Sequence, residues 1–395
     1  MELILILCTV VACFFVAKIF SLFDGFSYVG DRKSRFETLD GLRGYLALAV
    51  FLHHFVITYK WKTIGEFFSA DEIYFQNMGK VGVAIFFMIT GFLFFSKIIS
   101  DKGRTNWLGL YESRFFRIMP LYISTVVMIV FFAFWATDFK LLVDFSTILL
   151  QVFKWVFFWG GEVNTYEDTK LIISGVHWTL KYEWIFYLSL PLVSALFVRL
   201  GFFSILLFLV LSIYLYYYPS YAIGLSTKYI YFFAFGSLVA WVVDELKGSY
   251  SEFFSNGYWS SLSIVLILCA VFYPDTFDFL HFILISLFFV LIVFGVDIFG
   301  LLKLRGSIIL GEVSYSIYLL HGMVLYVLFS VFFNDVVTEL SRSEYYMYMP
   351  LVGIVVVLLS IFTFWFIEKP AILYGKRYLL SNFISSFSVF RFNGK

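Results

Sequence analysis

Apolar runs of about 20 residues recur along most of the chain, and they constrain its fold more than any other feature. A helix crosses the hydrocarbon core of a membrane with about 20 apolar residues, whereas a membrane β-strand needs about ten that alternate in polarity. The runs here do not alternate. Because 62% of the residues are hydrophobic and only 14% are charged, the chain cannot cover itself with a water-soluble surface. The sequence therefore predicts an all-α, polytopic membrane protein.

About eleven transmembrane helices are predicted from these runs. They lie near residues 3–22, 41–59, 80–99, 118–136, 178–197, 201–218, 227–243, 258–273, 279–297, 307–332 and 349–367. The stretch 145–159 is ambiguous because Gln151 and Lys154 interrupt it. It could be re-entrant, interfacial or a further span.

The positions of Lys and Arg predict the orientation, because positive residues that flank spans concentrate in the cytoplasm. With Met1 outside, most of the Lys and Arg residues that flank the spans fall on the cytoplasmic side. The cytoplasmic set is then Arg32, Lys33, Arg35, Lys97, Lys102, Arg104, Arg114, Arg117, Arg199, Lys247, Lys303, Arg305, Lys369, Lys376 and Arg377. The first segment has no basic n-region, so we expect a retained N-terminal anchor over residues 1–30. One membrane domain over 31–380 and a cytoplasmic tail over 381–395 complete the expected organisation.

Charge and cysteine usage exclude two classes of function. The net charge is +1, and there is no block of Lys and Arg long enough to follow a phosphate backbone, so nucleic acid is not an expected partner. Cys8, Cys13 and Cys269 all lie inside apolar runs and have no disulfide or metal-ligand spacing. We predict no metal site.

Ionisable residues within spans are costly, so each is a functional candidate. The run that begins at Asp40 carries the densest set, which also includes Arg43, His53 and His54. At 100° per residue, His54 lies about 20° from Arg43 and roughly 16 Å further along the helix, while His53 lies about 80° away. Arg43 and His54 are therefore predicted to share a face. The alternative is an interfacial Asp40–Arg43 pair with histidines that bond to neighbouring helices.

The span that begins near residue 178 carries a second set of polar residues in HWTLKYEWIFY. Lys181 and Glu183 lie about one turn deep, and Tyr187 lies one turn below Glu183 on the same face. An equally weighted interpretation makes Lys181 and Glu183 interfacial residues that reach the headgroups among Trp178 and Trp184.

A third span, 307–332, places His321 at a depth similar to that of His54. Three helices are thus expected to bring His54, Glu183 and His321 together in the outer half of the membrane. His281 has no charged neighbour at helical spacing, and we interpret it as a packing residue.

ESRFFRIMP places Arg114 and Arg117 on one face at the predicted cytoplasmic start of a span, with Pro120 in its first turn. Two guanidinium groups at this spacing can hold phosphates. On these two residues alone, ordinary positive-inside anchoring explains the pattern better.

The chain resembles the membrane-bound acyltransferase-3 family, which includes the O-acetylases of bacterial O-antigens and exopolysaccharides. The resemblance covers roughly residues 36–378. It is carried by six blocks in order: RFETLDGLRGYLALAVFLHHF, GVAIFFMITGFLFF, ESRFFRIMPLY, HWTLKYEWIFYLSLP, LGEVSYSIYLLHG and FIEKP. The family usually has a serine before the leucine of the HWTLKYE block. The segment before residue 36 adds one helix to the family's ten-helix core.

The resemblance implies that the donor is a cytosolic acyl-CoA, here acetyl-CoA. It also implies that His54 is the essential histidine and that Arg43, Arg114 and Arg117 lie on the donor side. Glu183 matches the glutamate of the family's third large block. Glu183 and His321 are the expected helpers of His54 in catalysis.

The expected reaction is acetyl transfer to a hydroxyl of a glycan or glycolipid, such as O-antigen in lipopolysaccharide or exopolysaccharide, at the bacterial cytoplasmic (inner) membrane. Candidate acceptor-binding residues are Asp40, His53, Trp178 and Tyr187. Direct transfer and an acyl-histidine intermediate both remain open, as does the oligomeric state. Two alternatives remain. One is an acyltransferase for a lipid or small-molecule acceptor, and the other is a proton-coupled transporter that uses the same polar residues, although no inverted repeat is visible.

Overall fold

The computed structural model describes residues 1–23, 36–218, 221–222, 225–247 and 253–378. The described part is helical except for its connecting segments, an isolated bridge and one short antiparallel pair, β1 (Tyr221–Ala222) and β2 (Leu225–Ser226). The prediction of an all-α helical bundle is confirmed. The predicted tail 381–395 and the basic residues near position 33 lie outside the described residues.

Every predicted span lies in or overlaps helical structure. The α-helices are α1 (Glu2–Phe20), α3 (Glu37–Ile64), α4 (Ile73–Ser100), α5 (Trp107–Ala136), α6 (Phe145–Val156), α7 (Trp178–Leu200), α8 (Phe202–Tyr217), α9 (Ile230–Glu245), α10 (Gly257–Phe272), α11 (Phe279–Val293), α12 (Arg305–Glu312), α13 (Ser314–Tyr326), α14 (Asn334–Glu339), α15 (Arg342–Met347), α16 (Met349–Thr363) and α17 (Lys369–Tyr378). Short 3₁₀ turns are η2 (Glu167–Ile173), η3 (Thr227–Tyr229), η4 (Phe253–Ser255) and η5 (Leu301–Lys303). Two π-helical turns, η6 (Val327–Phe332) and η7 (Phe364–Glu368), continue α13 and α16.

Seven helical segments in the described part are long and apolar enough to cross a membrane. They are α1, α3, α4, α5, α7, the joined α13 and η6, and the joined α16, η7 and α17. The other predicted spans fall on α8, α9, α10 and α11, which have only 15 or 16 residues each. The ambiguous stretch forms α6, whose 12 residues rise about 18 Å, less than a hydrocarbon core of about 30 Å.

Helix α5 begins at Trp107, eleven residues before the predicted span. The Asn106 side chain caps it by accepting a hydrogen bond from the Gly109 amide at 3.0 Å. Pro120 is therefore inside the helix and not in its first turn, which corrects the sequence prediction. The apolar run located the membrane segment, but the polar turns that extend the helix beyond it carry no hydropathy signal.

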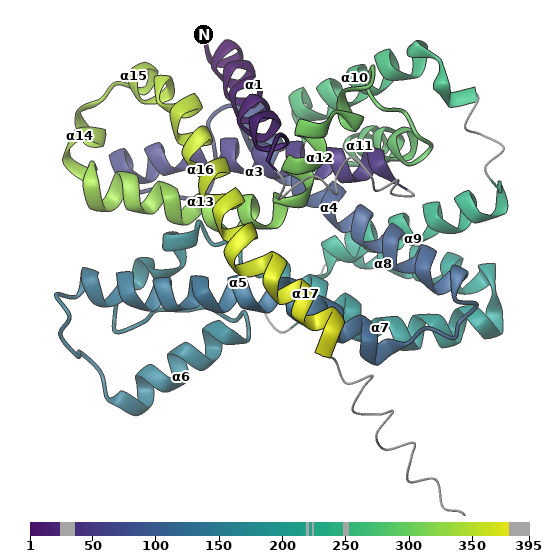
Figure 1. Cartoon of the computed structure of the whole chain (residues 1–395), viewed down its shortest axis with the longest axis horizontal. Helices are drawn as coiled ribbons and strands as arrows, with labels where there is room; N and C mark the ends of the chain where they lie inside the picture. Colours follow the sequence, from purple (N-terminus) through teal and green to yellow (C-terminus); the bar gives the residue numbers. More distant parts are fainter. Residues whose placement is uncertain (24–35, 219–220, 223–224, 248–252, 379–395) are drawn as a thin grey trace, which may run out of the picture.

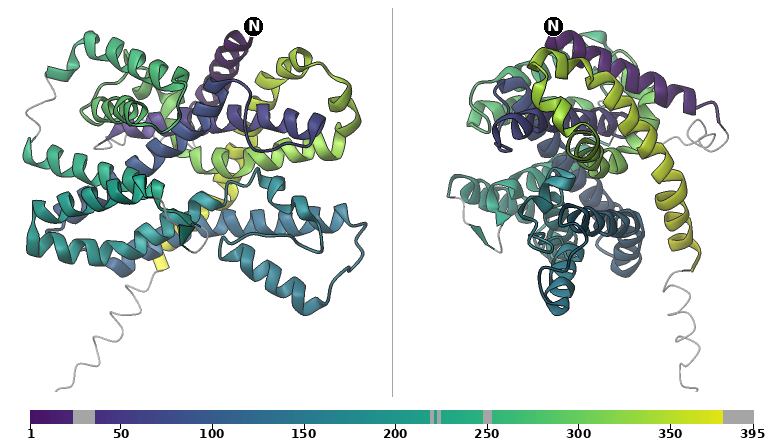
Figure 2. Two further views of the ribbon diagram at one scale, coloured as in Figure 1. Left: turned by 180° about the vertical axis from the view of Figure 1, so that it is seen from behind. Right: turned by 90° about the vertical axis from the view of Figure 1, so that its left-hand side faces the viewer.

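Helix α3 is central to the bundle and packs against α4, α12 and α13. Gly311 of α12 makes the closest approach, because a Cβ atom at this position would lie 1.7 Å from the backbone oxygen of Asp40. Small residues allow such backbone contact between membrane helices. The joined α16, η7 and α17 run diagonally across the bundle (Figure 1), while α1 packs on α16 and α12. Figure 2 shows the same arrangement from behind and from the side. The division into an anchor over 1–30 and a domain over 31–380 stays a prediction.

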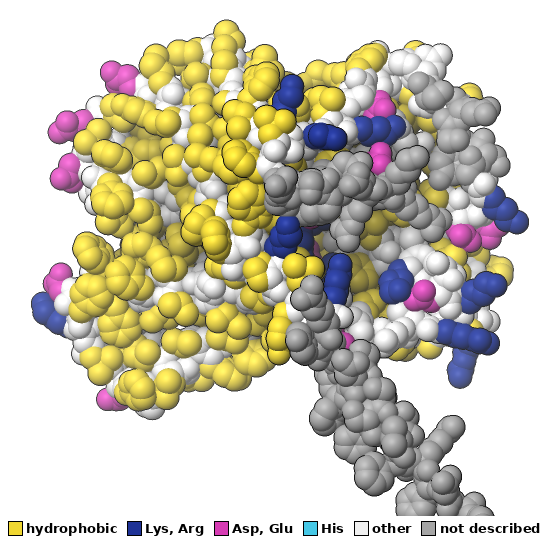
Figure 3. All heavy atoms as spheres, viewed as in Figure 1, with side chains coloured by type: hydrophobic (Ala, Val, Ile, Leu, Met, Phe, Trp, Pro, Cys, Tyr) yellow, Lys and Arg dark blue, Asp and Glu magenta, His cyan; other side chains and the backbone are white. Residues whose placement is uncertain are grey.

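Much of the surface of the bundle is hydrophobic, as expected of a surface that faces lipid. Large hydrophobic side chains such as Leu188, Val127 and Phe362 are more than half exposed. Figure 3 shows a broad hydrophobic area across the left and centre of one face, with most of the visible Lys and Arg side chains on the right. Such an area would be unstable in water but is expected in contact with acyl chains.

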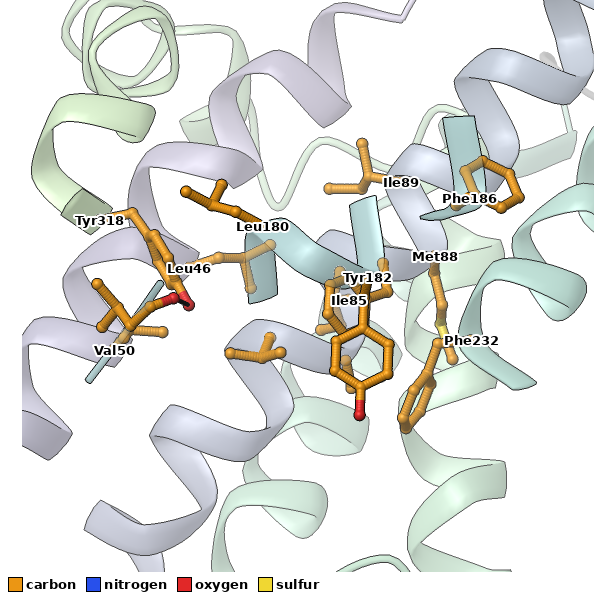
Figure 4. Packing of buried hydrophobic residues seen from close by; sticks show 14 of the residues in the cluster. Leu46, Val50, Ile85, Met88, Ile89, Leu180, Tyr182, Phe186, Phe232 and Tyr318 are labelled. Carbon is orange, nitrogen blue, oxygen red and sulfur yellow. Dashed lines mark hydrogen bonds between the residues drawn. The ribbon is translucent and has the colours of Figure 1, made fainter. Parts of the chain in front are cut away.

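The interior is built from apolar side chains of α3, α4, α7 and α9. In Figure 4, Leu46 and Val50 of α3 lie beside Tyr318 of α13 and Leu180 of α7, with Ile85 and Met88 of α4 further along the same cluster. This packing fixes the helix faces that carry the polar residues described next.

Candidate active site

One face of α3 runs between two polar regions of the interior, one around Arg43 and the other around His54. Arg43, Leu46, Val50 and His54 follow one another at helical spacing, so they form a single stripe. Leu46 and Val50 are buried. The predicted shared face of Arg43 and His54 thus becomes a stripe whose middle is buried and whose two ends, a cation and an imidazole, are partly exposed. The two ends are separated by about 16 Å of helix rise.

His54 and His321 form a hydrogen-bonded pair across the interface of α3 and α13. The His321 Nε2 atom lies 2.9 Å from His54 Nδ1, and the two rings stack with their centroids 5.0 Å apart. His321 is fully buried. The next residue, Gly322, leaves room for the backbone of η2, because a Cβ atom there would lie 2.3 Å from the carbonyl carbon of Ile173.

The hydrogen bonds around the pair determine which ring nitrogens carry protons when both rings are neutral. His321 Nδ1 lies 2.9 Å from the Ile317 carbonyl, which can only accept, so this nitrogen is the donor and Nε2 is the acceptor. His54 Nδ1 lies 3.1 Å from the Val50 carbonyl, so it too must be protonated, and it donates to His321 as well. The Nε2 atom of His54 is left with a free lone pair, which is what a general base requires.

Glu183 lies in a second region, around Arg43. A cavity with about 450 Å³ of empty space, part of it open to solvent, is lined by Arg43, Val83, Phe86, Phe87, Thr179, Leu180, Glu183, Ser314, Tyr315 and Tyr318. Glu183 accepts a hydrogen bond from the Tyr187 hydroxyl at 2.8 Å, as their shared face predicted. The expected convergence of Glu183 with both histidines is therefore corrected: Glu183 shares the cavity with Arg43, and neither His54 nor His321 lines it.

Tyr318 lies between the two regions. Its ring lines the cavity, and its centroid is 6.2 Å from that of His321, one turn further along α13. The Tyr318 hydroxyl is 2.9 Å from the Thr179 hydroxyl of α7. Sequence analysis did not single out Tyr318, because a tyrosine in a membrane helix is indistinguishable from a packing residue until its partners are known.

Arg114 and Arg117 both approach the Arg43 region but have different partners. Arg117 donates to the Glu312 carbonyl at 3.1 Å and lies 3.9 Å from a carboxylate oxygen of Glu368. The Arg114 guanidinium lies 5.2 Å from the centroid of the Phe94 ring. Arg117 is thus held by a carbonyl and a carboxylate, whereas Arg114 lies on an aromatic face and interacts with the Glu183 carboxylate and the Tyr187 hydroxyl.

Glu368 is a buried acidic residue that sequence analysis did not select, although it belongs to the FIEKP block. It is fully buried at the end of the π-turn η7 and accepts a hydrogen bond from the Ser316 hydroxyl. Ser316 is in turn 3.1 Å from the Thr363 hydroxyl. A glutamate at the end of an apolar run was the available signal.

Asp40, His53, Trp178 and Tyr187 were predicted to contact the acceptor. Asp40 is within electrostatic range of Arg43. His53 points its Nδ1 at the Phe75 carbonyl, 3.0 Å away. Trp178 and Tyr187 both pack among aromatic rings. None of these four is brought to the His54–His321 pair by a hydrogen bond, although the His53 ring touches that of His54, with centroids 4.9 Å apart.

His281 has the structural role that was expected for it. It is fully buried, and its Nδ1 accepts a hydrogen bond from the Phe277 amide at 2.8 Å, so its Nε2 donates to the Ala270 carbonyl at 3.0 Å. Within the described residues, no group of three or more His, Cys, Asp or Glu side chains could hold a metal ion.

The arrangement combines a hydrogen-bonded pair of imidazoles with a cavity that contains an arginine and a glutamate. Such a pair of regions can bind an anionic or strongly polar molecule at one end and remove a proton from a hydroxyl at the other.

Comparison with known proteins identifies the family of the chain. A family model described as an acyltransferase domain matches residues 36–367, which is most of the chain. No curated protein and no solved structure matches. The match begins at the residue before α3 and ends within η7, so it contains both polar regions and Tyr318. The chain therefore belongs to the acyltransferase-3 family and carries a membrane acyltransferase domain.

Proposed function

We propose that this protein transfers the acetyl group of cytosolic acetyl-CoA to a hydroxyl of an extracytoplasmic glycan, such as O-antigen or exopolysaccharide. The proposed location is the bacterial cytoplasmic membrane, with the N-terminus outside and the C-terminus in the cytoplasm. The family supports the acyl transfer, and the excess of Lys and Arg on one set of predicted loops supports the orientation.

The donor would enter on the Arg43 side. Arg114 and Arg117 lie near Arg43, and guanidinium groups can bond to the phosphates of a nucleotide. Because Glu312 and Glu368 already engage Arg117, we assign the direct contact to Arg43 and Arg114 and a positioning role to Arg117. The pantetheine arm would then extend past Tyr318 towards the histidine pair.

His54 would act as the base. Its Nε2 takes the proton from the acceptor hydroxyl, the hydroxyl oxygen bonds to the thioester carbonyl carbon, and the carbon–sulfur bond breaks. The proton on His54 then passes to the CoA sulfur, which regenerates the neutral imidazole. His321 accepts the Nδ1–H of His54 and so keeps Nε2 as the basic atom throughout. This hydrogen bond is the observation that carries the proposal.

The test uses purified full-length protein in nanodiscs and acetyl-CoA labelled in the acetyl group. With glycans from the host envelope, the wild-type protein is expected to release CoA and to move the label to the glycan, and His54→Ala is expected to do neither. If no glycan becomes labelled, or if His54→Ala labels it equally well, the proposed function is wrong.

The orientation can be tested separately in intact cells with a membrane-impermeant thiol reagent. In a variant without the natural cysteines, Asn334→Cys is expected to react from outside, whereas Lys102→Cys is expected to react only after the membrane is opened. Reaction of both from the same side would overturn the topology.

A further inference from the structure

A polar cleft opens where α3, α5 and α13 end, beside the segment that contains η2. Figures 1 and 2 show these three helix ends on the side of the molecule that carries α14. The cleft contains about 940 Å³ of empty space, part of it open to solvent. Its main lining residues are Trp61, Lys62, Trp135, Tyr166, Asp168 and Tyr326.

The walls of the cleft are aromatic and are held in place by specific contacts. The rings of Trp61 and Tyr326 lie nearly parallel, at 20° with centroids 6.4 Å apart. The Tyr326 hydroxyl is 3.0 Å from the Tyr166 hydroxyl. Trp135 is 51% exposed. Flat rings beside hydroxyl, carboxylate and amine groups suit a ligand with apolar C–H faces and polar edges.

The charges in the cleft favour a neutral ligand. Lys62 and Asp168 bring one charge of each sign to the lining. The Lys62 ammonium lies 4.7 Å from the centroid of the Trp61 ring and 3.5 Å from the Ser330 hydroxyl. An ammonium can donate a hydrogen bond to one hydroxyl of a sugar ring, and a carboxylate can accept a hydrogen bond from another. A polyanion would meet no excess positive charge here.

Two other grooves have a different character. One is lined by side chains of α8, α9 and α11 such as Ile213, Phe235 and Leu287, and the other by side chains of η6, α14 and α16 such as Leu328 and Val352. Their linings are almost entirely apolar, which suits the acyl chains of surrounding lipids. Only the Trp61 cleft, among these three, offers polar groups on several sides.

A chain of rings leads from the cleft to the proposed base. Trp61 meets Phe67 edge to face, with centroids 5.9 Å apart, and Phe67 stacks on His54 at 6.2 Å and 16°. Trp61 lies two turns beyond His54 on α3, which is about 10 Å of helix rise. A ligand in the cleft therefore lies at the histidine end of the stripe and far from Arg43.

From this placement we infer that the Trp61 cleft binds a neutral sugar residue of the acceptor glycan at the histidine end of the stripe. The inference rests on the proposed function for the identity of the reaction. The binding of the sugar itself does not depend on turnover, so it can be measured without acetyl-CoA.

The experiment measures equilibrium binding of methyl glycosides of glucose, galactose, mannose, rhamnose and N-acetylglucosamine to the full-length protein in nanodiscs. Glycoside detergents are avoided because their headgroups would compete for the cleft. At least one glycoside is expected to bind saturably, whereas 1-octanol does not compete with it. Trp61→Ala is expected to weaken this binding about tenfold or more, since the ring loses its stacking face.

Trp159→Ala is the matched control, because Trp159 is 55% exposed and does not line the cleft. It is expected to bind the glycoside as the wild-type protein does. Asp168→Asn is expected to weaken binding without altering the fold, which separates loss of a hydroxyl partner from loss of structure. If no glycoside binds the wild-type protein, or if Trp61→Ala and Trp159→Ala bind equally, the inference is wrong. If glycosides bind but no glycan is acetylated, the proposed function fails and the sugar site stands.

Discussion

The two ends of the α3 stripe are built from opposite kinds of chemistry. Around Arg43 lie charged groups of both signs, namely Asp40, Glu312, Arg114 and Arg117. At His54 the hydrogen bonds go to a backbone carbonyl and to a second imidazole. The proposed donor recognition and the proposed proton transfer are thus separated along one helix, so a substitution at one end is expected to alter one step and spare the other.

The largest expected effect is at the histidine end. His54→Ala removes the base, and loss of a general base commonly lowers the rate by 10² to 10⁴-fold. We expect acetyl transfer to fall by about this factor while acetyl-CoA affinity is retained, as measured by steady-state kinetics and by equilibrium binding.

His53→Ala is the neighbouring control. The His53 side chain bonds to the Phe75 carbonyl and packs against Gly79, so its loss is expected to leave more activity than the loss of His54. If His53→Ala abolished transfer and His54→Ala did not, His53 would be the base and the assignment of this role to His54 would be wrong.

The second effect concerns the charged end. Arg43→Ala is expected to weaken acetyl-CoA binding by about ten- to a hundredfold, because a charge-assisted hydrogen bond is typically worth 1.5–3 kcal/mol. The comparison variant is Arg117→Ala. It is expected mainly to destabilise the protein, since it leaves the buried Glu368 carboxylate without its cation.

These two arginine variants distinguish recognition from positioning. Acetyl-CoA affinity and thermal unfolding are measured on the same preparations. Unchanged affinity in a folded Arg43→Ala protein would remove Arg43 from the donor site.

A smaller effect is expected from His321→Ala. The variant loses the acceptor of the His54 Nδ1–H bond, and one such bond is worth about 1 kcal/mol, or somewhat under tenfold in kcat. The KM for acetyl-CoA should change little. His321→Gln offers a carbonyl oxygen as a substitute acceptor, so partial rescue is expected. A variant that loses stability but keeps the wild-type kcat would show that His321 only packs.

The smallest expected effect is on acid stability and involves His177, which lies outside the predicted catalytic set. Burial, followed by the charges of Lys181 and Lys170, lowers the pKa of His177 to about 3. His177 binds a proton near pH 6.5 in the unfolded chain but not in the folded chain. The free energy of unfolding is therefore highest above pH 6.5 and falls as the pH decreases below it. Between pH 7 and pH 6 the loss is somewhat less than about 1 kcal/mol.

His177→Phe should remove this pH dependence. Its ring can keep the stacking on Trp155, where the histidine centroid now lies 4.7 Å away. Thermal unfolding at several pH values is the measurement. An identical slope in both proteins would mean that His177 has the same pKa in the folded and unfolded states.

The sequence predicted much of the fold, because hydropathy and helical phase are local properties. The predicted spans fall on helices, and the shared face of Arg43 and His54 follows from one helix alone. The partner of Glu183 could not be predicted in the same way. A similar depth does not determine which helices are neighbours, and the Glu183 face of α7 turns out to meet Arg43.

Short-range geometry explains the remaining differences. Whether His54 Nδ1 or Nε2 is free depends on which carbonyls face the two rings, and no spacing in the sequence encodes this. The role of Glu368 depends on a π-turn that brings it to Arg117 and Ser316. The cleft at Trp61 combines residues from five separate segments, and each of them is unremarkable by itself.

The η2 segment has a consequence for how this enzyme could diversify. Its Ile172 and Ile173 side chains are fully buried, and Ile173 rests on Gly322 beside the histidine pair. The same segment carries Asp168, and Tyr166 immediately precedes it. Anchor and acceptor contacts are therefore only a few residues apart on a stretch that belongs to no transmembrane helix. If the Trp61 cleft binds the acceptor sugar as proposed, exchange of a few residues there is expected to change which sugar is accepted and to leave the histidine pair and the Arg43 region unchanged.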